Sequence, residues 1–138
     1  MAMGNYEGTA RRILSTYRTW AVVGLSPRPT RASHGVAAFL QQRGFRIIPI
    51  NPGADEILGE VAYPDLASVP VPIDVVDIFR RSDQAGRHVD EAIAVGAKAV
   101  WMQLGVIDED AAERARNAGL DVIMDRCPKI EYPRLIGP

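Results

Sequence analysis

Thiol and imidazole groups are scarce in this sequence, which holds one cysteine, Cys127, and two histidines, His34 and His88. A single cysteine excludes an internal disulfide framework, and three such side chains scattered along the chain do not form a zinc motif. We therefore expect no metal. A chain with so little need of disulfides suits a reducing compartment, so we also expect a cytoplasmic location.

Excess charge of one sign and long hydrophobic runs are lacking as well. Sixteen basic and seventeen acidic side chains leave a formal net charge of -1, which provides no global field to attract nucleic acid or an anionic membrane. No apolar run approaches the roughly 20 residues of a membrane-spanning helix, and the opening MAMGNYEGTARR has no apolar signal core. We expect neither nucleic acid nor membrane as a partner, so any anion site must be local.

Apolar runs and helical patterns alternate along the chain. With 138 residues, 47% of them hydrophobic, it has the size and composition of one domain, which we place at residues 1–138. Apolar residues at helical spacing are found over 6–17 and after three candidate helix starts, at 33, 82–83 and 108–110. We also expect a short strand near 61 and a helical turn over 65–68. The predicted strands cover 20–25, 46–50, 73–79, 99–103 and 122–124.

This alternation predicts a Rossmann-like, three-layer α/β/α fold around a parallel sheet of five or six strands. Sheets of this kind bind ligands in the crevice beyond the carboxyl ends of their strands. Here the segments at those ends are polar or contain glycine, and they read GLSPRPTRASHG, INPG, FRRSD, QLG and DRC.

The first of these segments has the features of an anion site. Gly24 lets the backbone approach a ligand, and a helix that starts near Ser33 offers free N–H groups and the positive end of its dipole. Arg28 and Arg31 add planar guanidinium groups that match phosphate, and His34 stands at the helix start, where it can touch a ligand. The alternative is that Gly24 only makes a tight turn and the arginines are solvated.

The usual nucleotide motifs are missing from this region. Gly24 is followed by Leu25 and Ser26 rather than by the G-x-G-x-x-G pattern, and the second strand ends in Asn51-Pro52 instead of an acid for ribose hydroxyls. There is no G-x-x-x-x-G-K-[ST] loop either. These absences disfavour NAD binding and ATP hydrolysis, and they favour a ligand that is rich in phosphate and needs no ribose carboxylate.

Five stretches carry a resemblance to a known family: AVVGLSPRPTRASHGVAAFL, GFRIIPINP, DVVDIFRRSD, WMQLG and DRCPKIEYPRL. In this order and spacing the chain resembles, over nearly its whole length, small stand-alone members of the CoA-binding domain family, which are similar to the N-terminal domain of the succinyl-CoA synthetase alpha subunit. The resemblance implies a Rossmann-like fold that holds coenzyme A across the strand ends. Carried over by position, it implies contacts at Gly24, Ser26, Arg28, Arg31, Asn51, Pro52, Phe79, Arg80, Gln103 and Gly105. We also expect Leu25, in the first of these loops, among the binding residues.

No catalytic constellation is recognisable, because the sequence does not bring a nucleophile, a base and an orienting group together. The resemblance does not transfer the synthetase's reaction either, since its phosphorylated histidine lies outside this domain. We expect His88 to be a surface or half-buried helical residue. Asp77, inside an apolar strand, is expected to have a structural partner, since burial of an unpaired carboxylate is costly.

Cys127 follows the last predicted strand and is therefore expected at the ligand-binding edge. One interpretation is a small half-buried residue beside Pro128. The other is that the pantetheine arm of coenzyme A reaches this thiol, which Arg126 and Lys129 would favour as thiolate, and that the two form a mixed disulfide under oxidation.

Three functions remain open at this point. The first, favoured by the missing catalytic groups, is a protein that binds coenzyme A or a short acyl-CoA and acts as a carrier, sensor or regulator. The second is an acyl-CoA-handling enzyme or subunit that needs residues from a protein partner. The third is a degenerate NAD(P)-binding domain.

Overall fold

A computed structural model describes residues 2–138, and it describes side chains from Tyr6 onward. In chain order the elements are α1 (Ala2–Thr16), β1 (Thr19–Val23), α2 (Ala32–Gln42), β2 (Arg46–Ile50), β3 (Glu56–Ile57), β4 (Glu60–Val61), a 3₁₀ turn η1 (Leu66–Ser68), β5 (Val75–Ile78), α3 (Ser82–Ala94), β6 (Ala99–Met102), α4 (Glu109–Asn117), β7 (Asp121–Ile123) and α5 (Pro128–Leu135).

Five of these strands form one parallel sheet in the order β2-β1-β5-β6-β7. The predicted three-layer α/β/α architecture is thereby confirmed, with five strands. The chain leaves β1 through α2 to reach β2 on one side and later returns to β5 on the other side of β1. Because the connections diverge at this point, the carboxyl ends of β1 and β5 border the crevice where such sheets bind ligands.

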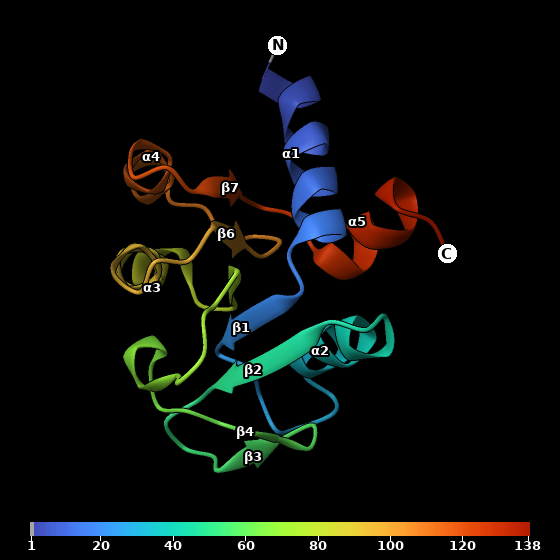
Figure 1. Ribbon diagram of the computed structural model, residues 1–138, viewed down its shortest axis with the longest axis vertical. Helices are drawn as coiled ribbons and strands as arrows, with labels where there is room; N and C mark the ends of the chain where they lie inside the picture. Colours follow the sequence, from blue (N-terminus) through green and yellow to red (C-terminus); the bar gives the residue numbers. More distant parts are fainter. Residues whose placement is uncertain (1) are drawn as a thin grey trace.

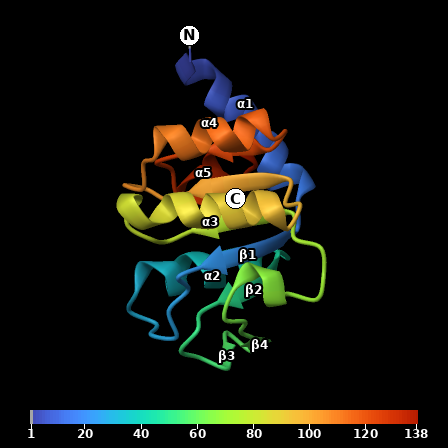
Figure 2. The ribbon, with the colours of Figure 1, turned by 90° about the vertical axis from the view of Figure 1, so that its left-hand side faces the viewer.

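The helices cover both faces of the sheet. Helices α3 and α4 lie on one face, and α1, α2 and α5 lie on the other (Figure 1). Figure 2 shows α3 and α4 in front of the sheet when it is viewed from their side. Each face has its own buried cluster: Ala85 and Val89 of α3 contribute to the first, and Val36 and Leu40 of α2 to the second. Helices α2 and α3 therefore flank the crevice from opposite faces.

Helix starts follow the sequence signals only in part. Helix α4 begins at Glu109, within the start expected at 108–110, and the Asp108 side chain caps it by accepting a hydrogen bond from the Ala111 N–H at 3.0 Å. Ser33 marks the start of α2 to within one residue but does not cap the helix, because α2 begins at Ala32 and Arg31 is its N-cap residue. Likewise, α3 begins at Ser82 after Arg81, without a side-chain cap. In both cases the serine hydroxyl bonds to a neighbouring loop instead, which ties the strand ends together.

Two elements were not predicted from the sequence. Strand β3 pairs with β4 in a small antiparallel hairpin, and α5 follows Cys127 directly. Pro128 occupies the first turn of α5, where its missing N–H costs nothing and its fixed φ favours the helix. The buried Glu131 of α5 accepts hydrogen bonds from Tyr6 and Arg134, so this helix fastens the two ends of the chain to each other.

Candidate functional site

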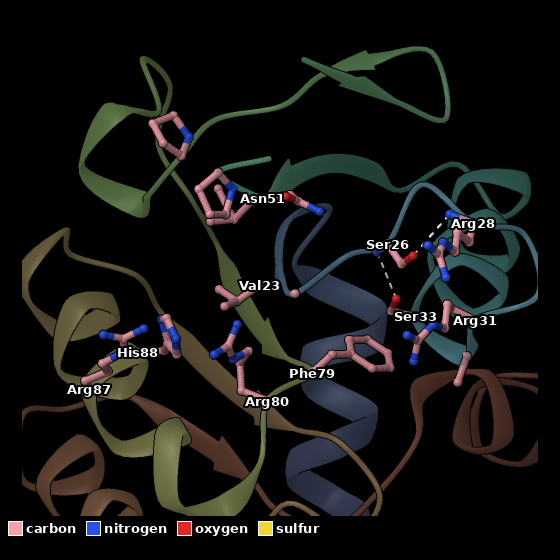
Figure 3. Close-up of a pocket in the computed structure, with 15 residues that line it drawn as sticks. Val23, Ser26, Arg28, Arg31, Ser33, Asn51, Phe79, Arg80, Arg87 and His88 are labelled. Atoms are coloured by element: carbon pink, nitrogen blue, oxygen red, sulfur yellow. Dashed lines mark hydrogen bonds between the residues drawn. The ribbon is translucent and has the colours of Figure 1, made fainter. Parts of the chain in front are cut away.

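A cavity of about 590 Å³ opens at the carboxyl ends of β1, β2 and β5, between the start of α2 and the face of α3. Figure 3 shows its side chains approaching from both sides of the sheet. The residues that line it are Val23, Gly24, Ser26, Arg28, Arg31, Ala32, Ser33, Ile50, Asn51, Pro52, Pro64, Phe79, Arg80, Arg87 and His88.

Gly24 is the point where three strand ends meet. Its N–H donates to the carbonyl of Ile50 at 3.1 Å, and a Cβ at this position would stand 2.4 Å from the carbonyl oxygen of Phe79. Its φ is +83°, a left-handed conformation that side-chain-bearing residues rarely adopt. Only glycine allows β1 to turn this close to the end of β5, so the floor of the cavity depends on it.

The loop from Gly24 to α2 is held by its own polar side chains. Ser33 Oγ accepts from the Ser26 N–H at 3.0 Å, and Ser26 Oγ accepts from the Arg28 N–H at 3.1 Å (Figure 3). Asn51 Nδ2 donates to the Leu25 carbonyl at 3.0 Å. These bonds order the loop without occupying the arginine side chains, which leaves them available to a ligand.

Positive charge dominates the cavity. Arg28, Arg31, Arg80 and Arg87 line it, and no carboxylate is among the lining residues. Within residues 6–138, none of these four guanidinium groups forms a salt bridge or a side-chain hydrogen bond, whereas Arg12, Arg81, Arg114 and Arg134 each pair with an acid. Four unpaired arginines in one hollow of a protein with net charge -1 favour an anionic ligand.

A second cavity of about 390 Å³ adjoins the first and is lined mainly by apolar groups. The two share Ala32, Phe79 and Arg80, so together they form one continuous groove along the strand ends. Its further lining residues are Val36, Arg81, Gln103, Leu104, Val106, Cys127 and Ile130. Gln103 is 5% exposed, and its Oε1 has no hydrogen-bond partner among the described residues.

The residues predicted from the sequence divide between the two cavities. The first collects Gly24, Ser26, Arg28, Arg31, Ser33, Asn51, Pro52, Phe79 and Arg80; the second collects Gln103 and Cys127.

Three predicted residues line neither cavity. The side chain of Leu25 is completely buried in the core, and His34, in the first turn of α2, lines neither cavity. Gly105 is engaged on the far side of the β6 end, where its N–H donates to Asp125 at 2.7 Å and its carbonyl accepts from Ser82.

Arg87 and His88 of α3 line the first cavity and were not among the predicted site residues. The strand ends and loops do not include them, because they lie inside a helix. The available signal was a pair of basic residues in the second turn of the helix that follows the β5 end. His88 is half-buried, as expected, and its Nδ1 is 2.9 Å from Glu91 Oε1.

Asp77 does not have the partner expected for it. Both carboxyl oxygens are buried without a hydrogen bond among the described residues. Burial raises the pKa of Asp77 well above its usual range, because an apolar site disfavours the charged form. Asp77 faces the sheet neighbours Val22 and Trp101 rather than either cavity, so it belongs to the core.

No group of three or more histidine, cysteine, aspartate or glutamate side chains in the described part of the chain could hold a metal ion. No helix of the described chain is long and apolar enough to cross a membrane.

Comparison with known proteins gives consistent matches over most of the chain. The model of a family described as a CoA binding domain matches residues 18–133. The uncharacterized protein YneT of Bacillus subtilis (strain 168) is 41% identical over 122 residues, which are 88% of this chain and 90% of that protein. A hypothetical protein from Pyrococcus horikoshii OT3 superimposes with a TM-score of 0.91 at 37% identity, covering 95% of this chain and 92% of its own.

A larger enzyme contains a similar unit. The dinucleotide-forming acetyl-coenzyme A synthetase 1 of Ca. Korarchaeum cryptofilum matches 83% of this chain with a TM-score of 0.71 and 27% identity. The match covers 27% of that enzyme. The likeness therefore concerns one part of the synthetase.

Proposed function

Because the chain belongs to the CoA-binding domain family, we propose that it binds coenzyme A in the groove formed by its two adjoining cavities. The observation that carries this proposal is a cavity without carboxylates that is lined by four arginines, none of them paired within residues 6–138. Coenzyme A combines a diphosphate and a phosphomonoester with a long, uncharged pantetheine arm, so it needs a cationic pocket next to an apolar one.

The groove supplies the two environments in the required order. The diphosphate lies at the loop from Gly24 to Ser33, where Arg28 and Arg31 and the N–H groups at the start of α2 provide charge-assisted hydrogen bonds. The pantetheine arm passes between Phe79 and Ala32 into the apolar cavity. There Gln103 lines the path of the arm, and the thiol end approaches Cys127.

We propose a carrier, sensor or regulatory role for this single domain of residues 1–138. The groove brings together no nucleophile, base and orienting group: His88 bonds to Glu91 and Asp77 faces the core. An acyl-CoA-handling enzyme completed by a protein partner is the alternative, and the match to part of an acetyl-coenzyme A synthetase is the observation that favours it.

Thermal denaturation with a panel of nucleotides tests the binding proposal. A ligand at 100 times its dissociation constant stabilises the folded state by about 2.7 kcal/mol, which corresponds to a rise in melting temperature of roughly 9 °C for a chain of this length. We expect this rise with coenzyme A and acetyl-CoA, and little change with NAD or ATP, for which the chain lacks the motifs. A larger rise with NAD or NADP would replace the proposal with a dinucleotide site.

Cys127 is the second point at which the proposal can be tested. It is buried and lines the apolar cavity. Arg126, which was expected to favour the thiolate form of Cys127, has its guanidinium 4.2 Å from the centre of the Tyr6 ring. With CoA disulfide as the reagent, the Cys127 thiolate attacks one sulfur, the reagent's S–S bond breaks, and a Cys127–CoA disulfide forms. The second CoA leaves as a thiolate and takes up a proton.

Intact-mass spectrometry reads out this exchange. We expect one added CoA that dithiothreitol removes and that the Cys127→Ser variant never acquires. Oxidised glutathione is the matched control, because it offers the same disulfide chemistry without a nucleotide to place it in the groove, and we expect it to react far more slowly. A protein that binds coenzyme A but gains no mass would show that Cys127 has only a packing role.

A further inference from the structure

The basic side chains of the first cavity form two groups on opposite sides of the crevice. Arg28 and Arg31 belong to the loop before α2, on one face of the sheet, whereas Arg87 and His88 belong to α3, on the other face. Figure 3 shows the two groups on opposite sides of the cavity with Arg80 between them. A ligand with one phosphate group would engage one side and leave the other unmatched.

The α3 group is carried by a rigid part of the structure. Ala85 and Val89 on either side of it are completely buried in the core of that face. Gly86 is packed against α4, since a Cβ there would stand 2.9 Å from Asp108 Oδ2. The helix therefore has little freedom to rotate, and Arg87 and His88 are held at the cavity by packing on the opposite side.

Both side chains have unused hydrogen-bonding capacity. Arg87 has no ion pair or side-chain hydrogen bond within residues 6–138. The His88 side chain is 12% exposed, with Nδ1 next to Glu91 and a buried Nε2 that has no partner among the described residues. Arg87 and His88 both line the cavity, so the guanidinium and the imidazole ring are the groups that α3 offers to a phosphate oxygen.

We propose that Arg87 and His88 form a second phosphate subsite, which binds the 3′-phosphomonoester on the ribose of coenzyme A. This assignment rests on the proposed function, in which the diphosphate occupies the loop before α2. The ribose and adenine then lie between the two groups, against Asn51, Pro52 and Pro64. A phosphomonoester carries more than one negative charge near neutral pH, so the subsite would make the protein select coenzyme A over 3′-dephospho-CoA.

Isothermal titration of coenzyme A and 3′-dephospho-CoA into a small set of variants tests the subsite. We expect the native protein to bind coenzyme A about 10- to 100-fold more tightly, the effect of one or two charge-assisted hydrogen bonds. Arg87→Gln and His88→Gln should each remove most of that preference by weakening coenzyme A alone. Arg28→Ala should weaken both ligands by the same factor, because both carry the diphosphate.

Arg116→Gln is the matched control, since Arg116 is an exposed helical arginine that lines neither cavity; it should change neither affinity. Melting temperatures of the unliganded variants check that each one is folded. Equal affinity of the native protein for the two ligands, or an equal loss of both in Arg87→Gln, would overturn the subsite and leave coenzyme A binding intact. If the native protein binds neither ligand, the proposed function falls and the subsite with it. Tight NADP binding that only Arg87→Gln weakens would keep a phosphomonoester subsite and overturn coenzyme A as the ligand.

Discussion

Replacement of Gly24 by alanine is expected to lower the free energy of unfolding by about 2 to 5 kcal/mol. A side chain at φ +83° costs about 1 to 2 kcal/mol in backbone conformation. The added Cβ would also stand 2.4 Å from the backbone oxygen of Phe79, which cannot move aside like a flexible side chain. Relief of such an overpacked contact costs roughly another 1 to 3 kcal/mol. For a domain with a total stability of about 5 to 15 kcal/mol, this is a large fraction.

Gly96→Ala separates the two causes. Gly96 has φ +78°, close to that of Gly24, but a Cβ there meets nothing within 4 Å. It should show the backbone cost of about 1 to 2 kcal/mol and nothing more. Urea denaturation of both variants and the native protein measures the difference. Equal losses in the two variants would mean that the contact between the β1 and β5 ends is relieved without cost.

Gly24→Ala should also abolish coenzyme A binding at temperatures where the variant is still folded. The displaced Phe79 lines both cavities, and the turn after β1 sets the path of the loop that carries Arg28 and Arg31. Gly96 follows the C-terminal end of α3 and lines neither cavity. Gly96→Ala should therefore bind coenzyme A with native affinity. Titration of the ligand into the folded variants reads out this second effect.

The fold followed from the sequence because its signals are local and repeated. A run such as Arg46–Ile50, bounded by Gly44 and Asn51-Pro52, admits little besides a buried strand, and β2 has those bounds. Helix caps were less predictable, because a serine near a helix start can bond either to its own helix or to a neighbouring loop. Ser33 bonds to Ser26, a choice set by the tertiary position of that loop. Helix α5 was missed because Pro133 interrupts its pattern and only Pro128 marks its start.

The candidate site was predictable at the strand ends and not on the helices. Parallel strands put their carboxyl ends at one edge, so Gly24, Asn51 and Arg80 could be grouped without coordinates. Which residues of α3 reach that edge depends on the rotation of the helix, and this is set by its packing through Ala85 and Val89 on the sheet. Sequence periodicity places Arg87 and His88 at the border of the polar face, but it does not say that a cavity opens there.

The sequence also did not predict that the buried carboxyl of Asp77 lacks a hydrogen-bond partner among the described residues. The burial of this carboxyl leads us to expect that the stability of the protein depends on pH. Desolvation raises the pKa of this carboxyl in the folded state well above the ordinary 3.8. The folded protein thus keeps the Asp77 proton at pH values where the unfolded chain releases it. The contribution of Asp77 to stability is therefore fully present below about pH 3.8 and is lost as pH rises toward its folded pKa, at a rate of up to about 1.4 kcal/mol per pH unit.

Asp77→Asn, a replacement of the same shape without a titrating proton, should remove this loss. We expect the variant and the native protein to have similar stability near pH 3.5, and the variant to be the more stable one by a margin that grows with pH up to the folded pKa. Asp74→Asn, three residues earlier in the sequence, is the control, and it should change stability in the opposite direction. Asp74 accepts from the Arg18 and Thr19 N–H groups at 3.2 Å and lies 3.4 Å from Lys98 Nζ, so its loss should cost about 1 kcal/mol at neutral pH. Urea denaturation from pH 3.5 to 8 measures both, and an Asp77→Asn variant that is less stable than the native protein throughout this range would show that the carboxyl is held by a partner on which the core depends.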